Sequence, residues 1–185
     1  MKRLFAAIKI NHANEFVRIY TELQNSLHDS KIKWVDVNNV HLTLKFFGET
    51  AESQIPVINN ALHKVASENT IIELKLIHSG IFGSSYNPRV IWFGIDQNPV
   101  LEKLADDVLD AMENIGYERD RQNFVPHLTI GRIKYINDRK KFQEVIQRYR
   151  SVEIQQEKID CFHLYESILR PQGPEYRVID SFSLD

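Results

Sequence analysis

Each half of this chain repeats one order of secondary structure, and the tripeptide His-Leu-Thr marks the repeat. The tripeptide begins 31 residues after Ile10, which closes the first apolar run, and 32 residues after Ile95, which closes the corresponding run of the second half. About 0.03 copies of His-apolar-Thr-apolar are expected by chance at this composition, so two copies indicate a shared cause. The repeat predicts two similar halves related by a pseudo-twofold axis.

Hydrophobic periodicity predicts the elements of the first half. Apolar runs indicate strands at residues 4–10, 32–35, 40–47 and 71–77. Apolar side chains spaced near 3.6 residues indicate helices within residues 16–27 and from about residue 51 to residue 67. The predicted order is therefore strand, helix, two strands, helix and strand.

After a predicted loop at residues 78–88, the second half repeats the order that the two halves share: strand, helix, His-Leu-Thr strand, helix and strand. Strands are expected at residues 89–95, from residue 127 onward, around 159–165 and around 176–182, with helices at 101–115 and around 142–149. Because no linker separates the halves, we expect one domain, residues 1–185, of two interlocking, pseudo-symmetric lobes around a central groove. The expected fold class is α+β, with a mostly antiparallel sheet in each lobe and helices on its outer face.

Bulk composition excludes several classes of protein. With 43% hydrophobic residues in 185 positions, the chain can bury a substantial core. Its net charge of −2 gives no positive field for long nucleic acids, although a small or terminal nucleotide is compatible with it. The one cysteine, Cys161, excludes an internal disulfide and a cysteine-rich metal site. Since no apolar run suits a signal peptide or a membrane span, we expect a cytoplasmic protein with no membrane partner.

Side-chain alternation predicts where the two tripeptides point. In a strand, His41 and Thr43 share one face and Leu42 occupies the other, and the same holds for His127 and Thr129 around the second leucine. Residues two positions apart are about 6.6 Å apart along a strand, so an imidazole and a hydroxyl can reach one tetrahedral group. Two such strands facing each other would place two imidazoles and two hydroxyls around that group.

Phosphodiester chemistry needs this set of side chains. In-line displacement at phosphorus places the attacking and leaving oxygens on opposite sides, so a base is required at one and an acid at the other. Histidine titrates at about pH 6.5, so one imidazole can be neutral while the other is protonated. Hydroxyl groups can donate to the non-bridging oxygens, where charge builds up. This chemistry needs neither a metal ion nor another cofactor. Near symmetry leaves acid and base unassigned between His41 and His127.

Two other interpretations of the tripeptides are open. The histidines could bind a metal ion, but neither has a nearby third ligand or a familiar ligand spacing. The threonines could serve only as strand formers, but two of the five threonines in the chain lie in the tripeptides. Repetition of the whole tripeptide favours the phosphodiester chemistry over both.

Five segments resemble, in order, those of the RNA 2′,3′-cyclic phosphodiesterases, also called 2′-5′ RNA ligases, which are two-histidine (2H) phosphoesterases. They are RLFAAIKI, NVHLTLKFFGE, NPRVIWFGI, FVPHLTIGR and FHLYESILRPQGPEYRVI. The segments extend over nearly the whole chain, and two His-x-Thr-x motifs in this context are fairly specific. The resemblance implies a bilobal α+β fold. It also implies hydrolysis of a 2′,3′-cyclic phosphate, on a nucleoside or an RNA end, to the 2′-phosphate.

The resemblance further implies roles for the repeated residues. His41 would be the proton donor, and His127 would be the proton acceptor that activates water. Thr43 and Thr129 would bind the phosphate. Reverse ligation of 2′,5′ ends is expected to be a minor activity.

Other side chains are candidate substrate contacts. Arg132 reaches the histidine face only if the strand alternation changes near Gly131. Aromatic rings could stack on a base, although a core role is favoured for Phe46 and Trp92. Two of the candidates lie in the part that resembles the family's C-terminal loop. The candidates are Arg132, Phe46, Tyr86, Tyr165, Arg170 and Tyr176.

Two alternative functions stay open from the sequence. A 2H enzyme could act on another phosphodiester, such as a 2′,5′-oligonucleotide or ADP-ribose 1″,2″-cyclic phosphate. A binding module could hold a nucleotide or an RNA end without turnover, but phosphate binding alone does not need an acid and a base. We expect RNA ends or nucleotides with a 2′,3′-cyclic phosphate as partners, and no obligate protein partner.

Overall fold

The computed structural model describes residues 1–119 and 124–185. The strands are β1 (Lys2–Lys9), β2 (Lys31–Trp34), β3 (His41–Thr50), β4 (Ile72–Gly83), β5 (Pro88–Ile95), β6 (His127–Tyr135), β7 (Glu153–Ile159), β8 (Cys161–Arg170) and β9 (Gly173–Ser183). The α-helices are α1 (Asn14–Ser26), α2 (Ile55–Ser67), α3 (Pro99–Asn114) and α4 (Arg139–Arg148), and short 3₁₀ helices occur at η1 (Val37–Asn39) and η2 (Glu52–Gln54).

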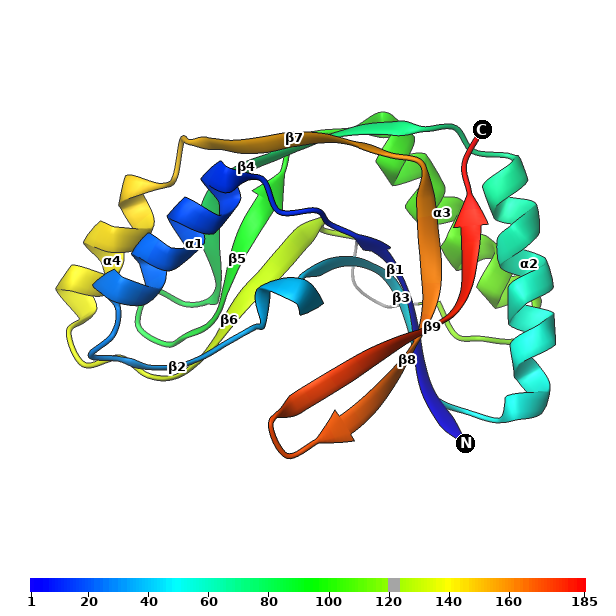
Figure 1. Ribbon diagram of the computed structural model, residues 1–185, viewed down its shortest axis with the longest axis horizontal. Coiled ribbons are helices and arrows are strands. Elements are labelled where there is room, and N and C mark those ends of the chain that lie inside the picture. The colour runs from blue at the N-terminus through cyan, green and yellow to red at the C-terminus, as the bar shows by residue number, and fades with distance from the viewer. Residues whose placement is uncertain (120–123) are drawn as a thin grey trace.

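Within these described ranges, nine strands form one antiparallel sheet (Figure 1). Its order is β7-β4-β5-β6-β3-β1-β8-β9, and β2 pairs with β6 as well. The α+β class and the antiparallel pairing predicted from the sequence are confirmed. The sheets of the two halves are joined, because Leu42 of β3 pairs with Leu128 of β6.

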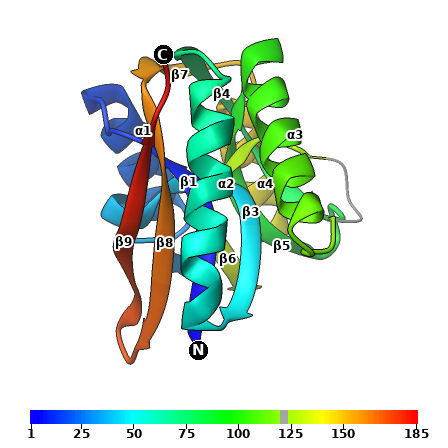
Figure 2. The same cartoon turned by 90° about the vertical axis from the view of Figure 1, so that its right-hand side faces the viewer.

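The α-helices cover the sheet in two pairs (Figures 1 and 2). Helices α1 and α4 lie together over the part that contains β4, β5 and β6, whereas α2 and α3 lie together over the part that contains β1, β3, β8 and β9. Phe16 of α1 packs edge-on against Phe93 of β5, with ring centroids 5.3 Å apart. A helix from the first half of the chain therefore covers strands of the second. Among the described helices, none combines the length and the apolar character needed to cross a membrane.

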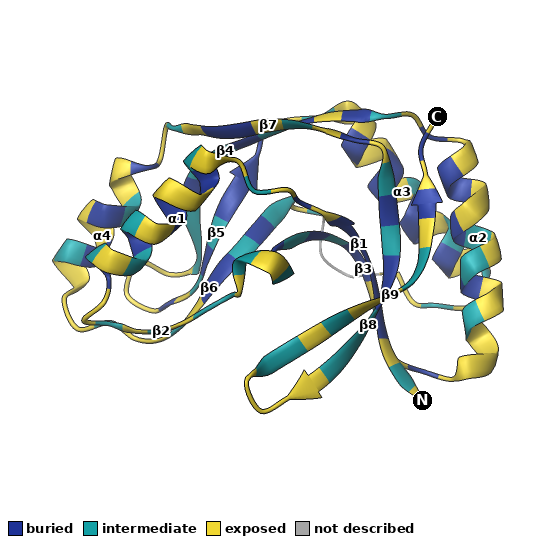
Figure 3. Ribbon diagram, viewed as in Figure 1, coloured by how far each residue is buried: buried dark blue, intermediate teal, exposed yellow. Residues whose placement is uncertain are grey.

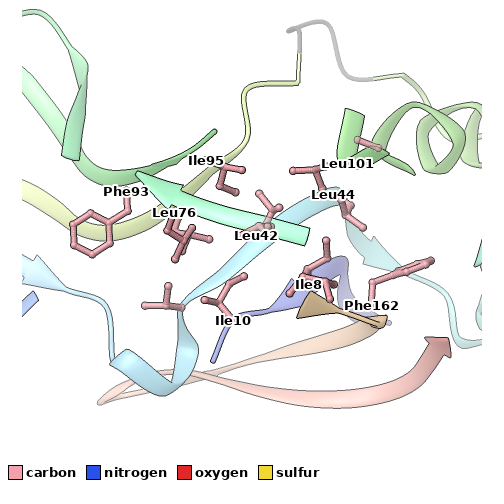
Figure 4. Packing of buried hydrophobic residues seen from close by; sticks show 14 of the residues in the cluster. Ile8, Ile10, Leu42, Leu44, Leu76, Phe93, Ile95, Leu101 and Phe162 are labelled. Atoms are coloured by element: carbon pink, nitrogen blue, oxygen red, sulfur yellow. The ribbon is translucent and has the colours of Figure 1, made fainter. Parts of the chain in front are cut away.

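One apolar cluster fills the space between the helices and the sheet. Leu42 and Leu44 of β3 contribute to it together with Leu76, Phe93 and Leu101 from other elements (Figure 4). Buried residues follow the sheet and the inner sides of the helices, and exposed residues follow the outer sides of the helices (Figure 3). The opposite side of the sheet, which we call the helix-free face, carries a separate small cluster of Phe5, Ala7 and Tyr165 with Tyr176 packed against it.

Two local predictions were wrong. Residues 78–83 belong to β4, which pairs with β5 as far as Gly83 opposite Pro88, and not to a loop. The glycine at position 80 gave a loop-like composition, but a Cβ there would lie 2.3 Å from the Trp92 ring, so this glycine serves close packing between strands. The strand expected around residues 159–165 is divided, because β7 ends at Ile159 and β8 begins at Cys161. Strand β7 itself was not predicted.

Candidate active site

The two His-Leu-Thr segments meet where β3 and β6 pair. Leu42 and Leu128 stand opposite each other, and both are buried in the core cluster. Neighbouring residues in a strand point to opposite faces, so the histidine and threonine on either side of each leucine project from the helix-free face. The structure thereby brings together four half-buried side chains, those of His41, Thr43, His127 and Thr129.

Both histidine rings are held in the same way. The Nδ1 atom of His41 lies 2.7 Å from the carbonyl oxygen of Asn39, and that of His127 lies 2.7 Å from the carbonyl oxygen of Val125. A carbonyl oxygen can only accept, so Nδ1 carries a proton in each ring. The Nε2 atom is left to accept or donate a proton on the helix-free face.

Aromatic rings pack against each histidine. The ring centroids of His127 and Phe82 are 4.7 Å apart, and those of His41 and Phe5 are 4.9 Å apart. Tyr176 adds an edge-on contact to His41 at 5.2 Å. Such packing restricts the rotation of each imidazole. Sequence reasoning missed both phenylalanines, because nothing in the local sequence separates them from the phenylalanines of the core.

The environment of His41 favours its neutral form in the free protein. Burial lowers the pKa of His41 below its ordinary value, and the nearby charges of His127 and Arg132 lower the pKa further, against the effect of the bond to the Asn39 carbonyl. His127 and Arg132 are therefore close enough to His41 for their charges to act on its imidazole. In the part of the chain that the structure describes, no group of three or more His, Cys, Asp or Glu side chains is placed to hold a metal ion.

A β-bulge follows the tripeptide in each strand. In β6, Thr129 pairs with Trp92 and Gly131 pairs with the preceding residue of β5, so β6 contains one extra residue at this point. In β3, Thr43 pairs with Ala7 and Lys45 pairs with the preceding residue of β1, so the residue between Thr43 and Lys45 is extra. A bulge shifts the alternation of the residues that follow it. Both strands therefore show two consecutive buried residues and then an exposed one.

These bulges place Arg132 and Phe46 at equivalent positions, each five residues after a histidine. Phe5 contacts His41 and also lies 6.0 Å from Phe46 between ring centroids, so Phe46 lies on the helix-free face. The core role favoured for Phe46 is wrong, since the side chain is 62% exposed. The change of alternation that Arg132 needs occurs, because the extra residue of β6 directly precedes Gly131.

The hairpin of β8 and β9 brings two of the remaining candidates to the site and leaves one away from it. Tyr165 stacks on Phe5 at 5.1 Å and is buried, and Tyr176 contacts both Phe5 and His41. Arg170 lies near the hairpin tip, where its Nε donates to Glu175 at 2.9 Å. The structure therefore does not bring Arg170 to the histidines.

A family model described as the 2′-5′ RNA ligase superfamily matches residues 12–167. The chain belongs to this superfamily. Among similar proteins, the RNA 2′,3′-cyclic phosphodiesterase of Methanocaldococcus jannaschii is 35% identical over 96% of this chain and 98% of its own length. The protein of the same name from Aquifex aeolicus is 38% identical over 82% of this chain and 81% of its own. The resemblance of the five sequence segments is thus confirmed.

Solved structures with a similar fold align with nearly the whole chain. TT0787 of Thermus thermophilus matches with a TM-score of 0.80 and 27% identity, over 98% of this chain and 97% of its own. LigT of Escherichia coli in its apo form matches with a TM-score of 0.74 over 99% and 97% of the two chains. At 21% identity, the likeness to LigT concerns the fold alone.

In this superfamily member, Asn39 couples the β8–β9 hairpin to His41, and sequence reasoning missed it. The side-chain Nδ2 atom of Asn39 donates to the carbonyl oxygen of Pro174 at 3.0 Å. The backbone carbonyl oxygen of Asn39 accepts from Nδ1 of His41. The carboxylate of Asp36 caps η1 by accepting from the backbone N–H of Asn38 at 2.9 Å. Such a cap can be predicted from sequence, but the contact with Pro174, 135 positions away, cannot.

Proposed function

We propose that this protein hydrolyses 2′,3′-cyclic phosphates, on RNA ends or on nucleosides, and leaves the phosphate on the 2′ oxygen. Two relatives that match most of the chain are named RNA 2′,3′-cyclic phosphodiesterase. The observation that carries the proposal is the pair of histidines on one face, each with Nδ1 held by a backbone carbonyl. This pair supplies two Nε2 atoms for one acid and one base.

In the proposed reaction, water attacks phosphorus in line with the 3′ oxygen. Nε2 of His127 takes a proton from the water as the new P–O bond forms. The bond from phosphorus to the 3′ oxygen breaks, and Nε2 of His41 gives its proton to that oxygen. The products are a 2′-phosphate and a 3′-hydroxyl, and proton exchange with solvent restores both imidazoles.

Thr43 and Thr129 are proposed to donate their hydroxyl protons to the non-bridging oxygens. Each lies two positions after a histidine on the same face, so the hydroxyls flank the phosphate between the imidazoles. Charge on those oxygens grows in the transition state, where fixed donors act most strongly. Arg132 would neutralise part of the same charge from its place after the bulge in β6.

The lowered pKa of His41 bears on the assignment of acid and base. In the free protein, burial and two positive neighbours favour neutral His41, which by itself suits a base. A bound phosphate brings negative charge to the pair and favours protonated imidazole instead. The proposed roles of acid and base therefore refer to the complex with substrate and not to the free protein.

The test is hydrolysis of nucleoside 2′,3′-cyclic phosphates in EDTA, with separation of the 2′- and 3′-phosphate products. The proposed steps use no metal ion, so wild-type protein should yield the 2′-phosphate. His41→Ala and His127→Ala should each reduce the rate by about 10² to 10⁴. His28→Ala, at an exposed histidine, is the matched control. Absence of product from wild-type protein, or full activity of both site variants, would overturn the proposal. 2′,5′-Oligonucleotides and ADP-ribose 1″,2″-cyclic phosphate in the same assay separate the alternative substrates.

A further inference from the structure

A cavity of about 550 Å³ lies where β5 begins and β6 ends. It is open to solvent, and its volume is within the range of small-molecule sites, roughly 300 to 1,000 Å³. Its lining includes two tyrosines and four cationic side chains, namely Tyr86, Tyr135, Arg89, Arg132, Lys134 and Arg139.

The cations of this cavity lack anionic partners. Within the described chain, no acidic residue lines the cavity, and none of its four cationic side chains forms an ion pair or a side-chain hydrogen bond. Elsewhere on the surface, Arg18, Arg119 and Arg177 each pair with at least one carboxylate. A protein with a net charge of −2 thus concentrates unpaired positive charge at one hollow. Charge complementarity indicates an anionic ligand with more than one charge.

The two tyrosines point to a ligand with flat rings as well as charge. Tyr86 is 79% exposed and Tyr135 is 60% exposed, so both rings are open to a ligand in the cavity that they line. Single-stranded nucleic acids are bound by such a combination, in which cations contact the phosphates and aromatic rings stack on the bases.

Arg132 connects the cavity to the histidine pair. It lines the cavity, and its charge acts on His41 and on Tyr176. The bulge in β6 turns Arg132 to the helix-free face, and Lys134, two positions further, alternates to the same side. A single-stranded nucleic acid whose end lies at the histidines can therefore continue into the cavity past Arg132.

We propose that this cavity binds the RNA strand that precedes the cyclic phosphate, with its phosphates at Arg89, Lys134 and Arg139 and a base on Tyr86. The inference rests on the proposed function for the placement of the strand's end. It predicts that the natural substrate is an oligonucleotide and that a lone nucleoside cyclic phosphate occupies only part of the site.

Binding of the stable product tests the inference without turnover. Affinities are measured by calorimetry for an RNA tetranucleotide that ends in a 2′-phosphate and for the nucleoside 2′-phosphate. Wild-type protein should bind the tetranucleotide more tightly. Tyr86→Ala should weaken tetranucleotide binding about fivefold or more, whereas Tyr86→Phe, which keeps the ring, should not.

The charged part of the cavity is tested by salt dependence. Lys134→Ala and Arg89→Ala should each lower the slope of log affinity against log salt by about 0.7 for the tetranucleotide, and leave nucleoside 2′-phosphate binding unchanged. Lys64→Ala, on the exposed side of α2, is the matched control. Thermal unfolding of each variant checks the fold.

Several outcomes would overturn the inference. They are equal affinity for the tetranucleotide and the nucleotide, equal effects of Lys134→Ala and Lys64→Ala, and equal binding of a glutamate peptide with the same charge. The hydrolysis assay is separate from these measurements. If the protein shows no preference for the tetranucleotide but still hydrolyses cyclic nucleotides, this inference is wrong and the proposed function stands. If the protein binds the tetranucleotide through the cavity but hydrolyses nothing, the proposed function is wrong and the binding site stands.

Discussion

Leu42 and Leu128 face each other at the point where β3 and β6 join the two parts of the sheet. Both side chains are buried, at 1% and 0% exposure. Their position fixes which residues stand beside them, because each leucine is flanked by a histidine and a threonine on the other face. Core packing on one side of the sheet therefore sets the arrangement of the two imidazoles and two hydroxyls on the other.

Truncation of this junction should cost much stability. Leu42→Ala leaves a cavity in a fully packed region and should lower the free energy of unfolding by about 2–5 kcal/mol. The matched control is Leu169→Ala, at a leucine that is 71% exposed, which should change stability by less than about 0.5 kcal/mol. Urea denaturation measures both. Equal effects of the two substitutions would show that the junction is not tightly packed.

A change of leaving group should separate the roles of the histidines. In a substrate with sulfur in place of the bridging 3′ oxygen, the leaving thiolate needs no proton. His41→Ala should then lose about 10² to 10⁴ in rate on the oxygen substrate and less than about tenfold on the sulfur substrate. His127→Ala should remain slow on both. Rescue of the His127 variant instead would assign the acid to His127.

The pKa of His41 should lie below 6.5 in the free protein, because burial and the charges of His127 and Arg132 oppose its protonation. The unfolded chain then binds more protons between the two pKa values, so stability from this group is complete above pH 6.5 and falls as pH decreases through that window. NMR titration of the His41 ring gives the pKa. Arg132→Gln, and separately added inorganic phosphate, should raise it. A titration above pH 6.5 without phosphate would contradict the prediction.

Arg132 should contribute to catalysis through charge and geometry. Loss of a hydrogen bond to a charged group costs about 1.5–3 kcal/mol, so Arg132→Gln should lower kcat/KM by about 10- to 100-fold on nucleoside cyclic phosphates. Arg132→Lys keeps the charge without the planar fork and should give an intermediate loss. The control is Arg150→Gln, at an exposed arginine after α4. If Arg132→Gln resembles this control, Arg132 does not act on the phosphate.

Asn39 should act on substrate binding through the hairpin. Asn39→Ala removes the bond to Pro174 and keeps the backbone carbonyl that holds His41. Loss of one such bond corresponds to about 0.5–1.5 kcal/mol, so KM should rise about two- to tenfold as Tyr176 is positioned less well. The neighbouring control is Asn38→Ala, because the Asn38 side-chain amide donates to Asp36 at 3.1 Å and not to the hairpin. A fall in kcat with unchanged KM would instead indicate that the His41 ring has moved.

Sequence reasoning predicted that the repeated histidines and threonines share one face, and it missed neighbours that depend on packing across strands. The shared face was predictable because a period-two pattern assigns residues to faces without knowledge of neighbouring strands. A core role was favoured for Phe46, but β3 contains an extra residue at Leu44, and the shifted alternation turns Phe46 away from the core. The local sequence of β3 does not indicate this bulge, because the bulge is defined by the pairing of β3 with β1.

The predictions of the fold likewise succeeded for regular elements and failed where a strand depends on its pairing partner. Long amphipathic helices and apolar strands were predicted near their observed positions, because each buries one regular stripe. Strand β7, with the sequence EIQQEKI, is mostly polar, and it is a strand because it pairs with β4 at the edge of the sheet. Its pairing partner lies about eighty positions earlier in the chain, so local propensity gave no signal.

Because a helix of the first half covers strands of the second, each half of the chain depends on the other for a complete core. Strand β5 needs α1 from the first half to cover its apolar side, and β3 is contacted by α3 from the second half. A cut in the loop between β4 and β5 would thus yield two fragments that each expose an uncovered strand and carry an unused helix. Such fragments should be insoluble alone and should regain structure only when refolded together.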